Sequence, residues 1–148
     1  MSDLSLVKEN NARRSDIKEA LDKIVESKQC PFCSKDYLEK EHKKPIIFDG
    51  QFWLATENRW PYEGAKEHLL FIHKAHITHI GELEKGAWQE LQEIAITIAK
   101  QRGIGGGTLI MRFGDSRYTG ATVTHLHAQL ICGDPEHPDR KPVLARVG

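Results

Sequence analysis

The segment THLHAQLIC, residues 124–132, alternates polar and apolar side chains and constrains the fold more than any other stretch. In a β-strand successive side chains point to opposite faces, so His125, His127 and Gln129 share one face and the apolar residues between them line the other. We therefore expect a central strand whose apolar face packs on a core. The opposite face is then either a solvated surface or the wall of a binding site.

Two stretches carry apolar residues at the spacing of an amphipathic helix. The first begins at Ser15, the expected N-cap, and covers about three turns before Cys30. The second spans residues 81–102 and is expected to end at Gly103. The apolar positions are Ile17, Leu21, Ile24 and Val25 in the first helix, and Leu83, Ala87, Trp88, Leu91, Ile94, Ala95 and Ile98 in the second.

Shorter apolar segments predict the remaining strands. Residues 45–56 indicate two strands joined at Asp49-Gly50, a strong hairpin signal. An exposed loop is expected at 57–67, a strand within 68–77, another strand within 105–114 and a polar loop at 115–123. The last residues should wrap the surface, with 143–147 as an edge segment. This order is that of an α+β domain whose antiparallel sheet carries helices mostly on one side.

Length and charge limit the class of protein. The chain has 148 residues, which fits one domain, expected at 15–148 after a flexible tail at 1–14. It carries 21 basic and 21 acidic residues, so no large basic field indicates a nucleic-acid or membrane partner. No apolar run reaches the roughly 20 residues of a membrane span, and the N-terminus lacks an apolar signal segment. We therefore expect a cytoplasmic protein.

The pair Cys30 and Cys33, in the segment CPFC, has the spacing of a metal-binding or redox site. Redox chemistry is disfavoured because this Cys-x-x-Cys follows a helix, whereas a redox pair normally opens one, where the helix dipole lowers the thiol pKa. The third cysteine, Cys132, has no partner spacing and is expected to be a small buried residue.

With these features together, the chain resembles the histidine triad (HIT) superfamily, whose motif is His-φ-His-φ-His-φ-φ. Because Gln129 stands in the third place, it is similar to the branch that includes galactose-1-phosphate uridylyltransferase and the diadenosine tetraphosphate phosphorylases. The resemblance extends over residues 30–133. It implies a HIT-like α+β fold, with an antiparallel meander sheet of about five strands, one long helix and an N-terminal helix, and it implies a homodimer formed through the long helix and a neighbouring strand.

The resemblance also implies a mechanism. His127 would attack the α-phosphorus of a nucleotide and form a covalent nucleotidyl-histidine, while a backbone carbonyl binds the other ring nitrogen. Gln129 would donate a hydrogen bond to a phosphate oxygen, but it cannot protonate a leaving group, so phosphoanhydrides fit best. Dinucleoside polyphosphates and nucleotide sugars are such substrates. The alternatives are a hydrolase that uses water as the acceptor and a regulator that binds nucleotide without turnover.

The cysteine pair gains two partners from the same resemblance. It implies one structural zinc ion per chain, held by Cys30, Cys33, His125 and a histidine that precedes the long helix. His76 aligns best with that last place, and His73 and His79 compete with it.

The nucleotide-binding residues are carried over from the family pattern. Asn58 would bind the ribose hydroxyls, and the small residues Gly120, Ala121 and Thr122 would let the backbone approach a phosphate. Arg112 stands where relatives commonly show asparagine, and we expect it either to face the phosphates or to lie on the surface. Three aromatic residues are candidates to stack on the base, with the core or the surface as the alternative place for each: Phe48, Trp53 and Trp60.

Overall fold

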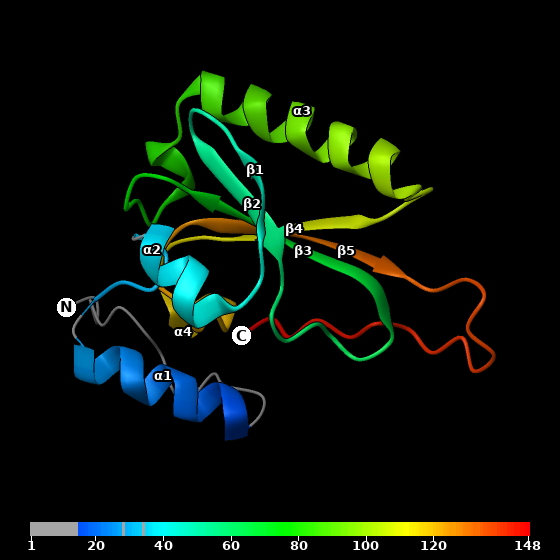
Figure 1. Cartoon of the computed structure of the whole chain (residues 1–148), viewed down its shortest axis with the longest axis horizontal. Coiled ribbons are helices and arrows are strands. Elements are labelled where there is room, and N and C mark those ends of the chain that lie inside the picture. Colours follow the sequence, from blue (N-terminus) through cyan, green and yellow to red (C-terminus); the bar gives the residue numbers. More distant parts are fainter. Residues whose placement is uncertain (1–14, 28, 34) are drawn as a thin grey trace.

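The computed structural model describes residues 15–27, 29–33 and 35–148. Five strands form one antiparallel sheet in the order β1-β2-β3-β5-β4 (Figure 1). The strands are β1 (Ile46–Asp49), β2 (Trp53–Glu57), β3 (Ala65–His73), β4 (Thr108–Arg112) and β5 (His127–Gly133). The predicted five-stranded α+β fold is confirmed. Its order departs from a simple meander because β5 lies between β3 and β4.

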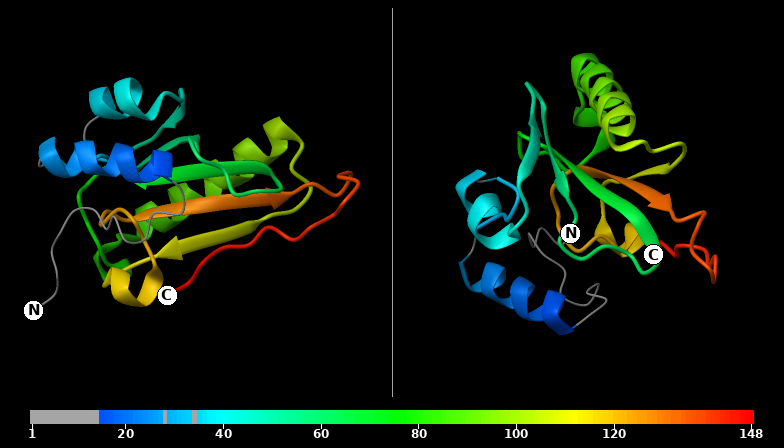
Figure 2. Two further views of the ribbon diagram at one scale, coloured as in Figure 1. Left: turned by 90° about the horizontal axis from the view of Figure 1, so that it is seen from below. Right: turned by 45° about the vertical axis from the view of Figure 1, so that its right-hand side comes forward.

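Helices cover both faces of this sheet. The long helix α3 (Lys85–Arg102) lies on one face, and α1 (Ser15–Ser27), α2 (Lys35–Tyr37) and α4 (Ser116–Thr119) lie on the other (Figures 1 and 2). A π-helical turn (Leu38–His42) continues directly from α2. Three of these four helices share one face, as predicted, but the two helices that the sequence predicted, α1 and α3, lie on opposite faces. The charged segment that follows Cys33 held too few apolar residues to predict a helix, although Leu38 is buried within it.

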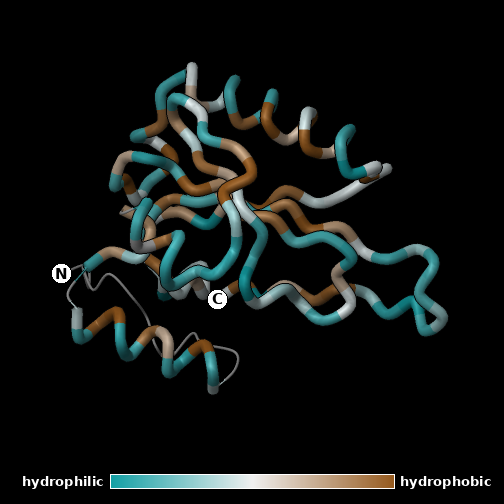
Figure 3. Tube along the Cα trace, in the orientation of Figure 1, coloured by the Kyte–Doolittle hydropathy of each residue, from teal (hydrophilic) through white to brown (hydrophobic). Residues whose placement is uncertain are grey.

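The main hydrophobic core lies between α3 and the sheet. The buried residues of α3 are Ala87, Leu91, Ile94 and Ile98, and the hydropathy colouring shows apolar positions recurring along this helix (Figure 3). The core contains Trp53, Ala55, Leu69, Phe71, Ala87, Leu91, Ile94, Ile98, Leu126, Ala128 and Leu130. A second cluster covers the opposite face and consists of Leu38, Leu54, Leu70 and Ile72 with Phe32 and Ile46 at its edge. Neighbouring residues of β5 thus enter different environments, as the alternation predicts.

The long helix differs from its predicted extent at one end only. It begins at Lys85 and not at residue 81, because a separate 3-10 turn, Ile80–Glu82, precedes it. His79 caps that turn by accepting a hydrogen bond from the Gly81 amide. The predicted stop is confirmed, since Gly103 adopts a left-handed conformation with φ of 65°. Trp88 is 42% exposed and therefore does not belong to the buried face.

The β1–β2 hairpin is confirmed, and a side chain of α3 binds its backbone. The carboxylate of Glu90 accepts hydrogen bonds from the backbone amides of Gln51, Phe52 and Trp53, at 2.6, 2.7 and 2.9 Å. The first two amides lie in the turn, and the third belongs to the first residue of β2. The hairpin and the long helix therefore form one unit.

The N-terminal helix is confirmed and lies apart from both sheet cores. Ser15, which was expected to be the N-cap just before the helix, is its first residue. Ile17, Leu21 and Ile24 are buried against Trp60, whereas Val25 is 46% exposed, so the predicted apolar face is narrower by one residue. The predicted tail at 1–14 lies outside the described residues.

Two of the predicted loops contain more structure than their composition indicated, and one predicted edge segment is wrong. Tyr62 is buried and β3 already begins at Ala65, within the segment expected to be an exposed loop. The polar loop at 115–123 contains α4, which is capped by Asp115. Residues 143–147 form no strand. Within the described ranges, no helix combines the length and apolar character that crossing a membrane requires.

Candidate functional site

The polar face of β5 opens toward α1, on the side of the sheet opposite α3. His127 pairs with Ile72 and Gln129 with Leu70 of β3, so both share a face with the second apolar cluster. Arg112 of β4 pairs directly with His127 from the other side. His127 and Gln129 are both buried, which excludes a merely solvated strand face.

The ring of His127 is held in one orientation. Its Nδ1 lies 2.7 Å from the carbonyl oxygen of His125, so Nδ1–H donates and Nε2 keeps its lone pair. Phe32 contacts the ring edge to face, with centroids 5.2 Å apart. Burial lowers the pKa of His127, partly offset by the hydrogen bond to His125 and reinforced by the charge of Arg112. The imidazole is therefore neutral at neutral pH, with a lone pair on Nε2.

Gln129 is oriented by His68, a residue to which the sequence assigned no function. Tyr62 donates its backbone N–H to His68 Nδ1 at 3.0 Å, so the proton of this imidazole sits on Nε2. His68 Nε2 lies 2.7 Å from Gln129 Oε1 and donates to it. Because the amide oxygen is engaged, the Gln129 NH₂ group is left as the donor on the cavity side.

Four potential metal ligands converge beside this strand. One sulfur or nitrogen atom from each of Cys30, Cys33, His76 and His125 lies within 4.8 Å of all the others. His76 Nδ1 is 3.1 Å from Cys33 Sγ and 3.2 Å from His125 Nδ1, and His125 Nδ1 is 3.4 Å from Cys30 Sγ. In a tetrahedral zinc site such atoms are about 3.3 to 3.8 Å apart. The chemistry and the spacing of this donor set therefore fit zinc.

The protonation of the cluster also suits a metal. His125 Nε2–H donates to the carbonyl oxygen of His73 at 2.6 Å, which leaves Nδ1 free to bind. Burial lowers the pKa of His125 to about 4, so the ring is neutral. Burial and the neighbouring Cys30 raise the pKa of Cys33 to about 12, so two adjacent thiolates need a cation to form.

The two competing histidines have other partners. His73 is buried, its ring contacts Trp53 edge to face, and its Nδ1 accepts a hydrogen bond from the Ala75 amide. His79 caps the 3-10 turn. Neither joins the cluster, and the structure places His76 there.

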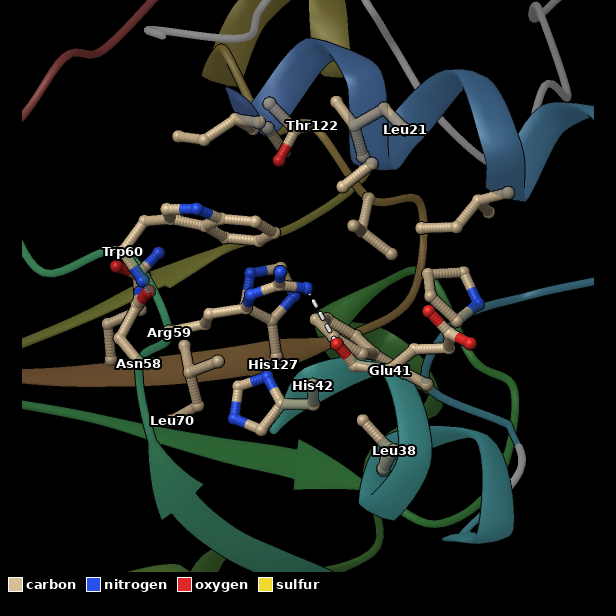
Figure 4. Close-up of a pocket in the computed structure, with 18 of the residues that line it drawn as sticks. Leu21, Leu38, Glu41, His42, Asn58, Arg59, Trp60, Leu70, Thr122 and His127 are labelled. Atoms are coloured by element: carbon tan, nitrogen blue, oxygen red, sulfur yellow. Dashed lines mark hydrogen bonds between the residues drawn. The ribbon is translucent and has the colours of Figure 1, made fainter. Parts of the chain in front are cut away.

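A cavity of about 330 Å³ lies between the polar face of β5 and α1, large enough for one nucleotide-sized ligand (Figure 4). His127 and Gln129 of β5 line this cavity. Leu21 of α1 and Trp60, which follows β2, line it as well (Figure 4). The other predicted binding residues that reach this cavity are Asn58, Arg112, Gly120, Ala121 and Thr122.

Two of the three aromatic candidates for base stacking are excluded. Trp53 is fully buried in the main core, and its Nε1–H donates to the carbonyl of Ala87. Phe48 packs against the same core. Both lie on the α3 side of the sheet, away from His127. Trp60 remains, and it lines the cavity.

Arg112 lines the cavity while much of its guanidinium binds the protein. Nε donates to the Thr119 carbonyl at 3.0 Å, and one terminal nitrogen contacts Tyr62 Oη and the Arg146 carbonyl at 3.3 and 2.7 Å. It thereby connects the loop at 119–122 to the C-terminal segment. Arg112 thus supports the loop and brings positive charge beside His127, so of the two expected places the structure shows the one that lines the cavity.

Several solved structures share this fold. A HIT family hydrolase from Clostridium thermocellum is 30% identical, with a TM-score of 0.55, and the match covers 74% of this chain and 95% of that one. A zinc-bound histidine triad family protein from Mycobacterium smegmatis is 18% identical, with a TM-score of 0.56 over 76% of this chain and 80% of that one. A hypothetical histidine triad nucleotide-binding protein from Sulfolobus tokodaii is 22% identical, with a TM-score of 0.56 over 78% and 77% of the two chains.

The fold and the buried His-x-His-x-Gln face thus define a histidine triad type of protein. The chain belongs to the HIT family, which confirms the resemblance seen in the sequence. No family model matches the chain, and no curated protein does. Membership of the glutamine branch stays a prediction that rests on Gln129.

Proposed function

We propose that the chain is a zinc-containing enzyme that cleaves a nucleoside phosphoanhydride through a covalent nucleotidyl intermediate on His127. One observation carries the proposal above the others. The His127 ring is neutral, buried and fixed by the His125 carbonyl, so that Nε2 is the nitrogen left with a lone pair beside the cavity. The names of the clostridial and archaeal relatives, a hydrolase and a nucleotide-binding protein, support it.

In the first step Nε2 of His127 forms a bond to the α-phosphorus. The phosphoanhydride P–O bond breaks, and the leaving phosphate or nucleotide keeps the electron pair. Gln129 donates to a non-bridging oxygen as its negative charge grows, and Arg112 stabilises the same charge from the paired strand. No residue protonates the leaving group, because Gln129 carries no acidic proton, and a phosphate leaving group needs little protonation.

In the second step an acceptor oxygen bonds to the phosphorus. The N–P bond breaks and the electron pair returns to Nε2. With water as the acceptor the reaction is hydrolysis, and the water proton is released to solvent. With orthophosphate or a sugar phosphate the reaction is phosphorolysis or transfer, which is the outcome that the glutamine branch favours.

Asn58 and the loop at 120–122 would bind the rest of the nucleotide. Asn58 lies beside His68 at the cavity wall, with its Oδ1 accepting the Trp60 amide at 2.8 Å. Its Nδ2 lies 3.1 Å from His68 Nε2, and an N–H of this amide would donate to a ribose hydroxyl. Gly120 has φ of 70°, a left-handed conformation that glycine adopts without strain.

Zinc, when bound to Cys30, Cys33, His76 and His125, would supply structural stability and no reactive group, because all four positions of a tetrahedral ion are filled by protein. His125 is joined to His127 by one intervening residue and by the hydrogen bond to its carbonyl. The metal cluster would therefore fix the main-chain oxygen that orients the nucleophile.

A homodimer is part of the proposal. β4 is an edge strand, and Leu109 on it is 48% exposed beside the main core. Ile96 and Trp88 of α3 are 47% and 42% exposed. Exposed apolar residues on an unpaired strand and on a nearby helix are typical of an interface between subunits.

A product assay tests the proposed reaction. Purified protein is incubated with diadenosine polyphosphates or nucleotide sugars, with and without orthophosphate, and the nucleotides are separated by chromatography. A nucleoside monophosphate as the product indicates hydrolysis, and phosphate-dependent nucleoside diphosphate indicates phosphorolysis. His127→Ala should abolish both while nucleotide binding persists. Binding without turnover in the wild type would instead indicate a regulator.

A further inference from the structure

Arg59 is a cavity-lining cation that the proposed mechanism does not use. It follows Asn58 in the β2–β3 loop and extends across the cavity toward the π-helical turn (Figure 4). Its guanidinium carbon lies 4.5 Å from the centre of the Trp60 ring, and Nη1 donates to the Glu41 carbonyl at 2.6 Å. A flexible side chain is therefore held in one place by stacking on one side and a hydrogen bond on the other.

The charge of Arg59 has no counterion in the part of the chain that the structure describes. Lysine and arginine residues elsewhere pair with carboxylates at 3.3 Å or less, but Arg59 joins none of these ion pairs. A guanidinium has five N–H donors, and only the contact with Glu41 uses one here. The remaining donors are available to an anionic ligand. Arg112 differs, because Thr119, Tyr62 and Arg146 already occupy much of its guanidinium.

A second cation, Lys43, lines the same cavity and has an unusual backbone conformation. Lys43 directly follows the π-helical turn and has φ of 59°, in the left-handed region. Glycine is the usual residue at such a helix end because a side chain costs free energy there. The lysine side chain lines the same cavity, two residues beyond the carbonyl that Arg59 binds. A lysine where glycine would be less strained indicates that its charge has a use.

The charge of Arg59 also acts on its surroundings. Burial lowers the pKa of the neighbouring His42, and the charges of Arg59 and Lys44 lower it further. Asp16, Glu19 and Glu41 also line this cavity, but among the described residues no ion pair joins Arg59 to them. The loop at 120–122, where the attacked phosphate is expected, lines the same cavity.

We propose that Arg59, assisted by Lys43, forms a second anion subsite that binds a phosphate of the substrate other than the one attacked by His127. The inference rests on the proposed function and narrows its substrate class. The preferred substrates carry at least two phosphates beyond the scissile bond, as diadenosine triphosphate and tetraphosphate do, whereas nucleotide sugars carry one. Arg59 is then a specificity residue and not a part of the bond-breaking step.

Substrates that share the adenylyl group but differ in the leaving group test this assignment. The probes are diadenosine tetraphosphate, diadenosine triphosphate and the 4-nitrophenyl ester of AMP, whose leaving group has no phosphate. Arg59→Ala should lower kcat/KM for both polyphosphates by about tenfold or more, the usual effect of losing a hydrogen bond to a charged group. The loss for the ester should be at least about fivefold smaller. Arg59→Lys, which keeps the charge but not the stacking, should lie between.

Two further variants separate binding from folding. Lys43→Gly should raise Tm by about 2 °C because it relieves the positive φ, and yet lower kcat/KM for the polyphosphates. Arg140→Ala removes an exposed arginine outside this cavity and should change neither quantity. An equal loss for all three substrates in Arg59→Ala would show that Arg59 only supports the fold. If the wild type cleaves none of them, the proposed function itself fails.

Discussion

Replacing His68 by phenylalanine is expected to slow turnover while leaving the cavity intact, because the new ring fills the same space and still stacks on Tyr62. The ring centroids of His68 and Tyr62 are 4.6 Å apart in the structure. Phenylalanine lacks the Nε2–H group that binds Gln129 Oε1 at 2.7 Å. The Gln129 amide then loses the contact that directs its NH₂ group toward the substrate, and either end of the amide can face the phosphate.

The size of the effect follows from the bonds lost. A donor that stabilises charge in the transition state contributes about 2.7–4 kcal/mol, or about 10²–10³ in kcat. Disorienting that donor removes part of this, and we expect kcat to fall about tenfold to hundredfold. The substitution also leaves Gln129 Oε1 and the Tyr62 amide without this partner, and each costs about 1–3 kcal/mol of folding free energy when buried.

Steady-state kinetics on a double-mutant cycle of His68→Phe and Gln129→Ala measures the coupling. If His68 acts only through Gln129, the double variant should be no slower than Gln129→Ala alone. Two effects that multiply in full would refute the positioning role. His137→Phe is the matched control, since His137 is exposed and its Nδ1 accepts only the Asp139 amide. Urea denaturation of each variant separates a loss of folded protein from a loss of rate.

Other consequences of the structure are open to direct measurement. Metal analysis should find about one zinc per chain, and Cys33→Ser should lose it and lower Tm; equal Tm values with and without chelator would contradict this. His42 has a pKa that burial lowers from 6.5, so its stabilising contribution is complete above that pH and is lost as the pH falls. His42→Gln should therefore flatten the decline in Tm between about pH 7 and 5, and parallel Tm curves would argue against it. Glu90→Gln should lower the free energy of unfolding by about 1.5–3 kcal/mol in urea melts, and an unchanged midpoint would show that the hairpin does not need the carboxylate. Light scattering should find a dimer that Leu109→Lys dissociates, whereas a wild-type monomer would disprove the interface.

Local patterns predicted the regular elements well. The apolar spacing of both helices, the glycine at the end of α3 and the alternation in β5 reflect forces that act within a few residues. The turn after Cys33 was missed because its charged composition hides a single buried residue, Leu38. The place of α1 over the second face of the sheet could not be predicted, because the Trp60 contact that buries this helix joins residues far apart in the chain.

The candidate site could also be predicted only in part. Spacing alone placed His125, His127 and Gln129 on one face, and the family pattern placed His76 with the cysteines. The partners that orient these groups could not be predicted, because they depend on strand register. Gln129 meets His68 only because β3 and β5 pair with Leu70 opposite Gln129.

The contribution of Arg59 likewise depends on tertiary structure. Next to Asn58 in the sequence it is an ordinary loop arginine. Its proposed role depends on the Trp60 ring on which it stacks, on the Glu41 carbonyl that it binds, and on the lack of an ion pair with any described residue. The same applies to Lys43, since no local pattern indicates that a lysine will occupy a left-handed backbone position.

The covalent intermediate is the most direct test of the central claim. The protein is mixed with a radiolabelled dinucleoside polyphosphate, quenched in alkali within the first turnover and analysed by intact mass spectrometry and peptide mapping. We expect a mass increase of one nucleoside monophosphate on His127, stable in base and labile in acid, and absent in His127→Ala. Turnover by the wild type without any such adduct, or an adduct that persists in His127→Ala, would contradict the proposed mechanism.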